Sequence, residues 1–311
     1  MSSLRDVQSS NAALHQRYTR ATAVFTGATN GIGLATLQAF VKSIPHPTAI
    51  IAGRSRHAFD DKGTQLKALN PNAEIVFLEA DLSLIKNVDA VGEHIATRLD
   101  NHKVDFVCMS QGVAPIEGRE FTAEGLDACL ALAYYGRMRL LSDLLDAGVL
   151  KADASVVNVL VGGREGRVFE DDLALETHYS IVNMRAHVAS LTTLSFDALS
   201  GRRPGLRLLH VYPGTVDTGL LARGVRNWVL WLVVLVVERL LMLRGMSAEE
   251  SGERMLGLGL GGGFGGGSFG VDWRGVVGGS KWLEAYRGKE GMKERVWAFN
   301  ERVWKQALEE K

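Results

Sequence analysis

The chain has 311 residues, of which 46% are hydrophobic and 23% charged, and its 35 Lys and Arg residues balance its 35 Asp and Glu residues. This mix is typical of a globular protein with a full core, and the zero net charge argues against a nucleic-acid partner. The two cysteines, Cys108 and Cys129, lie in apolar segments, so neither a disulfide framework nor a zinc site is expected. The polar N-terminus has no signal-peptide core, and we expect a cytoplasmic protein.

Apolar, β-branched segments alternate with segments of helical spacing along the first two thirds of the chain. Strands are predicted at residues 21–25, 48–52, 74–78, 104–109, 155–160 and 206–211, and helices at 34–41, 58–69, 84–99, 124–145 and 177–199. This alternation indicates a parallel sheet covered by helices on both faces and joined by right-handed crossovers. The predicted fold class is therefore α/β, a Rossmann-like doubly wound sheet in one domain over residues 21–311, preceded by an N-terminal extension over residues 1–20.

Three segments follow the sixth predicted strand. Residues 219–245 contain an apolar run from Trp228 to Val237, which is about half as long as a membrane span and is followed by a charged pair. Residues 257–279 are rich in glycine and lack the Lys-Ser/Thr pair of a phosphate loop, which predicts a flexible connector. Apolar residues at helical spacing predict a C-terminal helix over residues 289–308.

A glycine-rich turn, Thr26-Gly27-Ala28-Thr29-Asn30-Gly31-Ile32-Gly33, follows the first predicted strand. Glycines here let the backbone turn tightly and approach a pyrophosphate, while the N–H groups and the dipole of the next helix face the anion. The spacing Gly-x-x-x-Gly-x-Gly at this place resembles that of the short-chain dehydrogenase/reductase superfamily, and the resemblance extends over about residues 20–220. It implies that the cofactor is bound by Gly27, Thr29, Asn30, Gly31, Ile32 and Gly33.

The resemblance also implies contacts to the adenosine end of the cofactor. Arg54 and Ser55 follow the second strand, where an arginine pairs with the 2′-phosphate of NADP, so NADP(H) is preferred over NAD(H). Asp81 and Leu82 match the adenine-contacting positions, although this segment also fits a helix cap.

Two further segments match the cofactor site of the superfamily. Gln111 and Gly112 follow the fourth strand, where the superfamily usually has the motif Asn-Asn-Ala-Gly and this chain matches it only in part. Gly112 is expected beside the adenine ribose. The Pro-Gly segment after the sixth strand implies contacts around the nicotinamide carboxamide from Pro213, Gly214, Thr215, Val216 and Thr218.

The usual Asn-Ser-Tyr-Lys catalytic group of the superfamily is rewritten in this chain. Ala133 stands at the asparagine position, and Leu160 and Val161 at the hydroxyl positions. The Tyr-x-x-x-Lys pair can be aligned in two registers. One places Tyr179 at the tyrosine position and Asn183 at the lysine position, and the other places Ile181 and Arg185 there. The second register needs the shorter insertion before Pro213 and is favoured for alignment.

The expected catalytic residues are Tyr179, the phenol nearest the site, and Arg185, which supplies a positive field but does not easily exchange a proton. A surface or packing role for Tyr179 is equally compatible with the sequence. Arg164 and Glu165 follow the fifth strand at the substrate edge; they are either substitutes for the lost groups or, more commonly, solvated loop charges.

The segment from Ala131 to Arg137 and the Arg185-x-His187 pair are similar to a subset of fungal secondary-metabolite dehydrogenase-like proteins. This similarity implies a lipophilic biosynthetic intermediate as substrate, in either redox or non-redox chemistry. The superfamily resemblance implies an NADP(H)-dependent oxidoreductase acting on a hydrophobic carbonyl or alcohol, with residues 219–245 as an apolar substrate lid. The apolar run also fits contact with a membrane face, a dimer contact in a homo-oligomer, or a core-packing helix. The rival functions are a non-redox isomerase or cyclase that retains NADP(H), and a non-catalytic NADP(H)-binding protein.

Overall fold

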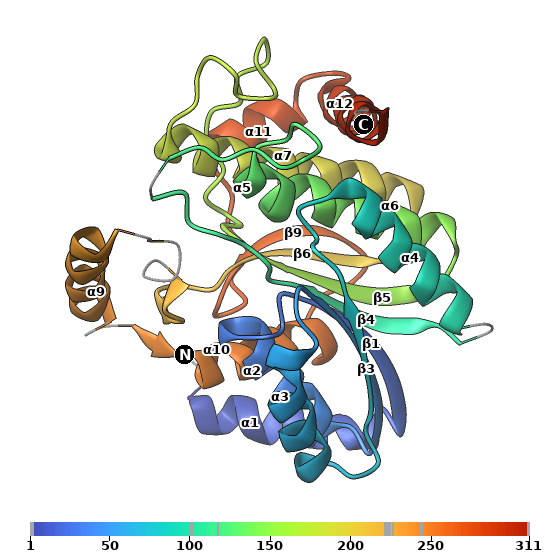
Figure 1. The fold of residues 1–311 in the computed structure, drawn as a ribbon. Coiled ribbons are helices and arrows are strands. Elements are labelled where there is room, and N and C mark those ends of the chain that lie inside the picture. Colours follow the sequence, from blue (N-terminus) through green and yellow to red (C-terminus); the bar gives the residue numbers. More distant parts are fainter. Residues whose placement is uncertain are drawn as a thin grey trace.

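A seven-stranded sheet forms the centre of the computed structural model, which describes residues 3–99, 102–116, 118–220, 225, 227–242 and 245–309 (Figure 1). Its neighbouring strands all run parallel, in the order β3-β2-β1-β4-β5-β6-β9. The strands are β1 Arg20–Thr26, β2 His46–Gly53, β3 Glu74–Glu79, β4 Val104–Met109, β5 Leu150–Val159, β6 Arg207–Tyr212 and β9 Gly267–Asp272. A separate short parallel pair joins β7 Val216–Asp217 to β8 Met246–Ser247.

Helices cover both faces of the sheet (Figure 1). One face carries α4 Ile85–Leu99, α5 Ala128–Leu130, a π-helical turn η2 Ala131–Tyr135, α6 Gly136–Asp146 and α7 Ile181–Arg202, with α11 Lys281–Arg287 and α12 Met292–Glu309 packed outside them. The other face carries α1 Leu4–Ala12, a 3₁₀ turn η1 Ala13–Gln16, α2 Gly31–Ser43, α3 His57–Leu69 and α10 Ala248–Leu260. Helix α9 Trp228–Met242 lies beside this body, at the left of Figure 1.

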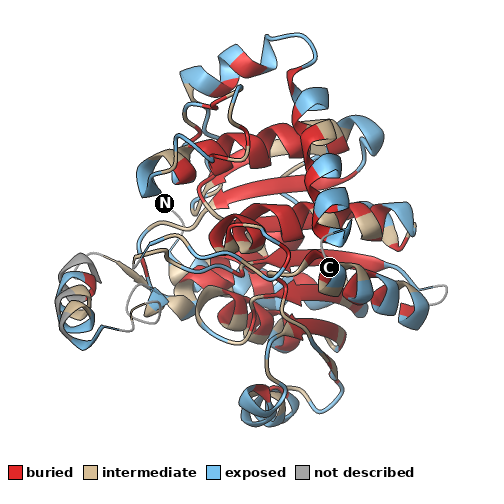
Figure 2. Cartoon of the chain, turned by 45° about the horizontal axis from the view of Figure 1, so that its top comes forward, coloured by how far each residue is buried: buried red, intermediate tan, exposed pale blue. Residues whose placement is uncertain are grey.

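The central strands are mainly apolar because both of their faces are covered. In β1, Val24 packs with the cluster under α4 and α6, whereas Ala23 and Phe25 pack with the cluster under α2 and α10. Figure 2 shows most of the central sheet as buried and the outer surfaces of the helices as exposed. The predicted α/β fold with one doubly wound sheet is confirmed, and the chain reverses its winding direction between β1 and β4.

The prediction of a flexible glycine-rich connector over residues 257–279 is wrong. This segment holds the end of α10 and the whole of β9, which pairs with β6 as a seventh strand. Helix α10 packs against α2, and a Cβ atom at Gly252 would lie 2.5 Å from Ala35 Cβ. At Gly259 it would lie 3.0 Å from Cδ2 of Phe106. Gly259 in this segment, like Gly252 just before it, is therefore a place where two elements approach closely. Composition alone does not distinguish such a glycine from one that makes the backbone flexible.

The N-terminal segment is packed against helix α10. Ser3 caps α1 with a capping box to Asp6, and the side chain of Asn11 is buried. Asn11 Nδ2 donates to a carboxylate oxygen of Glu253 at 2.6 Å, so α1 is joined to α10.

The predicted lid over residues 219–245 lies partly outside the described residues. Its described helix, α9, exposes large apolar side chains to solvent, listed here with their exposed fractions: Trp228 73%, Trp231 40%, Leu232 45%, Val236 58% and Val237 45%. Within the part of the chain that the structure describes, none of the helices combines the length and the hydropathy that crossing a membrane requires.

Candidate active site

A cavity of about 440 Å³ opens at the carboxyl ends of the central strands. Its lining comes from the segments after β1, β2, β3, β4, β5 and β6, from the stretch between α5 and α6, and from the start of α7. The reversal of winding between β1 and β4 lies under it, which is the usual place for a ligand in an open parallel sheet.

The glycine turn forms one wall of this cavity as a close-fitting cradle. Gly27 has φ +78° and Gly31 has φ +55°, both in the left-handed region that favours glycine. A Cβ atom at Gly27 would lie 2.6 Å from Gln111 Cα, and one at Gly33 would lie 2.7 Å from the carbonyl oxygen of Gly27. Asn30 is the N-cap of α2, so the helix N-terminus faces the cavity. This geometry fits a bound pyrophosphate.

The residues predicted to bind the cofactor divide into two groups, those that line the cavity and those that do not. Those that line the cavity are Gly27, Thr29, Asn30, Gly31, Ile32, Gly33, Arg54, Leu82, Gln111, Gly112, Pro213 and Thr218. Those outside its lining are Ser55, Asp81, Gly214, Thr215 and Val216.

The residues outside the lining have local structural partners. The Ser55 hydroxyl accepts a hydrogen bond from Ala58 N at 3.2 Å, and Asp81 accepts one from Ser83 N at 3.0 Å. Gly214, with φ +81°, lies against Trp273, where a Cβ atom would be 2.9 Å from Cδ1. The side chains of Ser55 and Asp81 therefore stabilise the turns that carry the lining.

The structure places the two predicted catalytic residues differently. Tyr179 precedes α7 and does not line the cavity. The guanidinium of Arg119 lies 4.6 Å from the ring centroid of Tyr179, and the buried Tyr179 hydroxyl has no hydrogen-bond partner in the described chain. Burial raises the pKa of Tyr179 to about 12. Arg185 lines the cavity together with Ile181, one turn earlier on α7. The geometry therefore favours the register that pairs Ile181 with Arg185.

A buried arginine that the sequence reasoning did not single out joins the ends of β4 and β5 below the cavity. Arg137 is 1% exposed, and its Nη1 donates to Asn158 Oδ1 at 2.6 Å and to the carbonyl oxygens of Val159 at 2.9 Å and Met109 at 3.2 Å. Its Nη2 donates to the carbonyl oxygen of Gln111.

The π-helical turn before Arg137 completes this set of contacts. The Leu132 carbonyl accepts from Arg137 Nε at 3.2 Å, and this turn is a feature common at functional sites. Burial lowers the pKa of Arg137 to about 9, which leaves the guanidinium charged at neutral pH. No pattern in the sequence indicated this role, because the acceptors of Arg137 come from separate strands.

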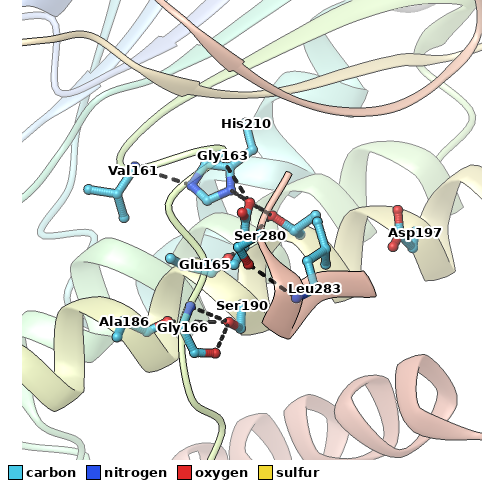
Figure 3. A network of polar contacts seen from close by, with 12 residues as sticks. Val161, Gly163, Glu165, Gly166, Ala186, Ser190, Asp197, His210, Ser280 and Leu283 are labelled. Carbon is cyan, nitrogen blue, oxygen red and sulfur yellow. Dashed lines mark hydrogen bonds and ion pairs between the residues drawn. The ribbon is translucent and has the colours of Figure 1, made fainter. Parts of the chain in front are cut away.

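The loop after β5 is fixed by the buried network in Figure 3. Val161 N donates to His210 Nε2 at 3.2 Å, and His210 Nδ1 lies 2.8 Å from Thr193 Oγ1, which donates to Glu165 Oε1 at 2.8 Å. Gly163 N donates to the same carboxylate oxygen at 3.0 Å. Burial lowers the pKa of His210 to about 3, so the ring is neutral, with its proton on Nδ1 in this arrangement.

The expectation that Glu165 is a solvated loop charge is wrong, because its side chain is buried in this network. Arg164 differs from it: its guanidinium lies 4.1 Å from the ring centroid of Tyr212, at the end of β6. The network therefore determines the backbone course of the loop in which Val161 lines the cavity.

Comparison with known proteins agrees with this geometry. Residues 21–226 match the short chain dehydrogenase family. The chain belongs to this family. An oxidoreductase of Emericella nidulans is 35% identical over 256 residues, covering 82% of this chain and 76% of that protein. The oxidoreductase lepF of Aspergillus flavus is 30% identical over 287 residues, covering 82% of this chain and 79% of that protein.

Solved structures of short-chain dehydrogenases share the fold. Levodione reductase superposes with a TM-score of 0.60 at 20% identity, covering 78% of this chain and 92% of that one. An NADPH-bound carbonyl reductase from chicken fatty liver gives a TM-score of 0.59 at 15% identity, covering 84% of this chain and 100% of that one. The prediction of the superfamily is thus confirmed. The cavity of this chain is lined on α7 by Ile181 and Arg185.

Proposed function

We propose that this short-chain dehydrogenase binds NADP(H) and transfers hydride to or from a hydrophobic carbonyl compound or alcohol, an intermediate of secondary metabolism. The observation that carries the proposal is the cradle formed by Gly27, Gly31 and Gly33 at the start of α2, which has room for a pyrophosphate and not for Cβ atoms. An NADPH-bound carbonyl reductase with this fold and fungal oxidoreductases related to this chain support it.

Arg54 supports the preference for NADP(H) over NAD(H). It lines the cavity after β2, is exposed, and forms neither a hydrogen bond nor an ion pair with any other residue that the structure describes. A guanidinium pairs with a phosphate through two parallel hydrogen bonds, so a 2′-phosphate is the ligand it suits. When the cofactor is bound, the nicotinamide supplies or accepts the hydride, and the protein residues orient it and the substrate.

The wall on the substrate side supports a hydrophobic substrate. It includes Leu132, Leu160, Ile181, Met184 and Val188, and Leu220 lines the cavity at the start of the predicted lid. We infer that residues 219–245 cover the bound substrate, as the sequence predicted. Contact of α9 with a membrane face and contact of α9 across a dimer stay predictions. Vesicle sedimentation would test the membrane contact, and light scattering would test the dimer.

The proposal is tested by cofactor binding and by turnover. Quenching of protein fluorescence should show NADPH binding at least about tenfold tighter than NADH, and Arg54→Ala should remove most of this difference because one charge-assisted contact contributes about 1.5–3 kcal/mol. Arg203→Ala, an exposed arginine at the far end of α7, serves as the matched control.

Absorbance of NADPH with hydrophobic ketones, enones and alcohols then separates the rival functions. NADPH that binds tightly but is neither consumed nor formed with any of these compounds would refute the redox function. It would favour an isomerase, a cyclase or a non-catalytic binding protein instead.

A further inference from the structure

The substrate end of the cavity combines apolar walls with a guanidinium group on α7. Leu160 and Val161 continue from the end of β5, and Ile181, Met184 and Val188 project from α7. Arg185 lies among them on the same helix and lines the same cavity. The charged group that α7 presents to a hydrophobic compound here is therefore positive.

The charge of Arg185 is free to act on a ligand. The residue is exposed, and it has neither a hydrogen bond nor an ion pair with any other described residue. Arg137 also lines the cavity, but it is 1% exposed and donates to the Asn158 side chain and to four backbone carbonyl oxygens. Arg185 is therefore the guanidinium that can bind an oxygen of the substrate.

The groups that line this end stabilise negative charge better than they deliver protons. The Cys129 thiol donates to the carbonyl oxygen of Val113 at 3.4 Å, and burial raises its pKa to about 12. The Ser110 hydroxyl donates to the carbonyl oxygen of Thr26 at 3.2 Å. Among the described lining residues the remaining ionisable groups are guanidinium groups, which stay protonated at working pH.

This wall suits a reaction in which hydride transfer and proton transfer are separate. Reduction of an isolated ketone puts full negative charge on an alkoxide, which needs a proton as it forms. Hydride addition to a conjugated enone gives an enolate, whose charge is spread over oxygen and carbon and which water protonates later. A fixed cation next to the oxygen stabilises that enolate without giving up a proton.

Resting on the function proposed above, we propose that this cavity reduces the carbon–carbon double bond of a hydrophobic α,β-unsaturated carbonyl compound, with Arg185 stabilising the enolate oxygen. The β-carbon receives the hydride of NADPH and forms a new C–H bond, leaving NADP⁺. The π electrons of the double bond move to form the enolate, with its negative charge on the carbonyl oxygen beside Arg185. A proton from water then bonds to the α-carbon, the carbonyl reforms, and hydroxide remains.

A matched pair of substrates tests the proposal. Benzylideneacetone and benzylacetone share one carbon skeleton and differ by the conjugated double bond. With NADPH that carries deuterium at its transferable position, benzylideneacetone should give benzylacetone with deuterium on the benzylic carbon. With ordinary NADPH in D₂O, the deuterium should appear on the α-carbon. Benzylacetone itself should be reduced at least about 100-fold more slowly.

The possible outcomes separate this proposal from the function on which it rests. If both ketones are reduced to alcohols with the deuterium on the carbinol carbon, the enone proposal is overturned and the NADP(H)-dependent redox function stands. If NADPH fails to bind, or if larger enones and ketones also leave it unconsumed, the proposed function itself is refuted.

Variants of Arg185 give a measurement that does not depend on turnover. In protein saturated with NADP⁺, para-nitrophenolate is an apolar oxyanion whose absorbance reports its charged form. Wild-type protein and Arg185→Lys should bind it at least about tenfold more tightly than Arg185→Met, and Arg203→Met should match wild type. Arg185→Met should also lower kcat for benzylideneacetone by about 100-fold or more, while the Kd of NADPH stays within about threefold. Equal phenolate binding by wild type and Arg185→Met would overturn the role of Arg185.

Discussion

Substituting alanine for Gly252 tests whether α10 is packed directly on the helix that holds the cofactor cradle. A Cβ atom there would lie 2.5 Å from Ala35 Cβ and 2.6 Å from Thr36 N, both on α2. Carbon atoms in contact normally stand about 3.5–4.0 Å apart, so α10 and α2 would have to separate locally by about 1 Å.

The magnitude follows from two opposing terms. Alanine in place of glycine inside a helix is favourable by about 0.5–1 kcal/mol, whereas overpacking of a close contact costs about 1–3 kcal/mol. Because backbone atoms of α2 form part of this contact, we place the cost near its upper limit and expect Gly252→Ala to lower the free energy of unfolding by about 2 kcal/mol. The displaced α2 also carries Gly31 and Gly33, so the affinity for NADPH should fall as well.

The matched control is Gly201→Ala near the end of α7, where a Cβ atom would meet nothing within 4 Å. This variant should be unchanged or more stable by up to about 1 kcal/mol. Urea unfolding followed by circular dichroism at 25 °C gives both free energies, and fluorescence titration gives the Kd of NADPH. If Gly252→Ala is as stable as Gly201→Ala, the close packing of α10 on α2 is refuted.

Three more predictions follow from single side chains. Tyr179→Phe should keep kcat within about twofold, because the hydroxyl lies outside the cavity lining; a loss of about 100-fold in steady-state assays would restore the catalytic role expected from sequence. Arg137→Met should lower the free energy of unfolding by about 3–5 kcal/mol, because several buried acceptors lose their donor at about 1–3 kcal/mol each. Arg139→Met, which breaks partly exposed pairs with Asp89 and Asp143, should cost about 1 kcal/mol or less, and equal losses of Tm would contradict this difference. Burial lowers the pKa of His187 to about 4, below its unfolded value of about 6.5, so the stability that the neutral ring contributes is present above pH 6.5 and is lost as the pH falls toward 4. Urea unfolding at pH 5 should therefore give a free energy of unfolding about 2 kcal/mol lower than at pH 7. The variant His187→Asn should reduce that difference.

The cofactor side of the site was predictable because its residues are local in sequence. The turn from Gly27 to Gly33 joins one strand to one helix, so its shape depends on neighbours a few residues apart. The same holds for Arg54, which follows β2 directly.

The catalytic side was less predictable because it depends on where α7 begins. The Ser180 hydroxyl accepts from Asn183 N as the N-cap, which starts the helix at Ile181 and leaves Tyr179 on the preceding loop beside Arg119. Sequence spacing alone supported either register. The helix start decides which side chains line the cavity.

By itself the sequence determined the α/β class, the six strands it predicted and the glycine cradle, since hydrophobic periodicity and turn chemistry are local properties. Only the tertiary structure decided that Gly252 and Gly259 are packing positions and that residues 267–272 add a seventh strand. It also decided that Arg137 joins β4 to β5. In each of these cases the partner is far away in the sequence, and a glycine or an arginine takes its role from the atoms that folding brings against it.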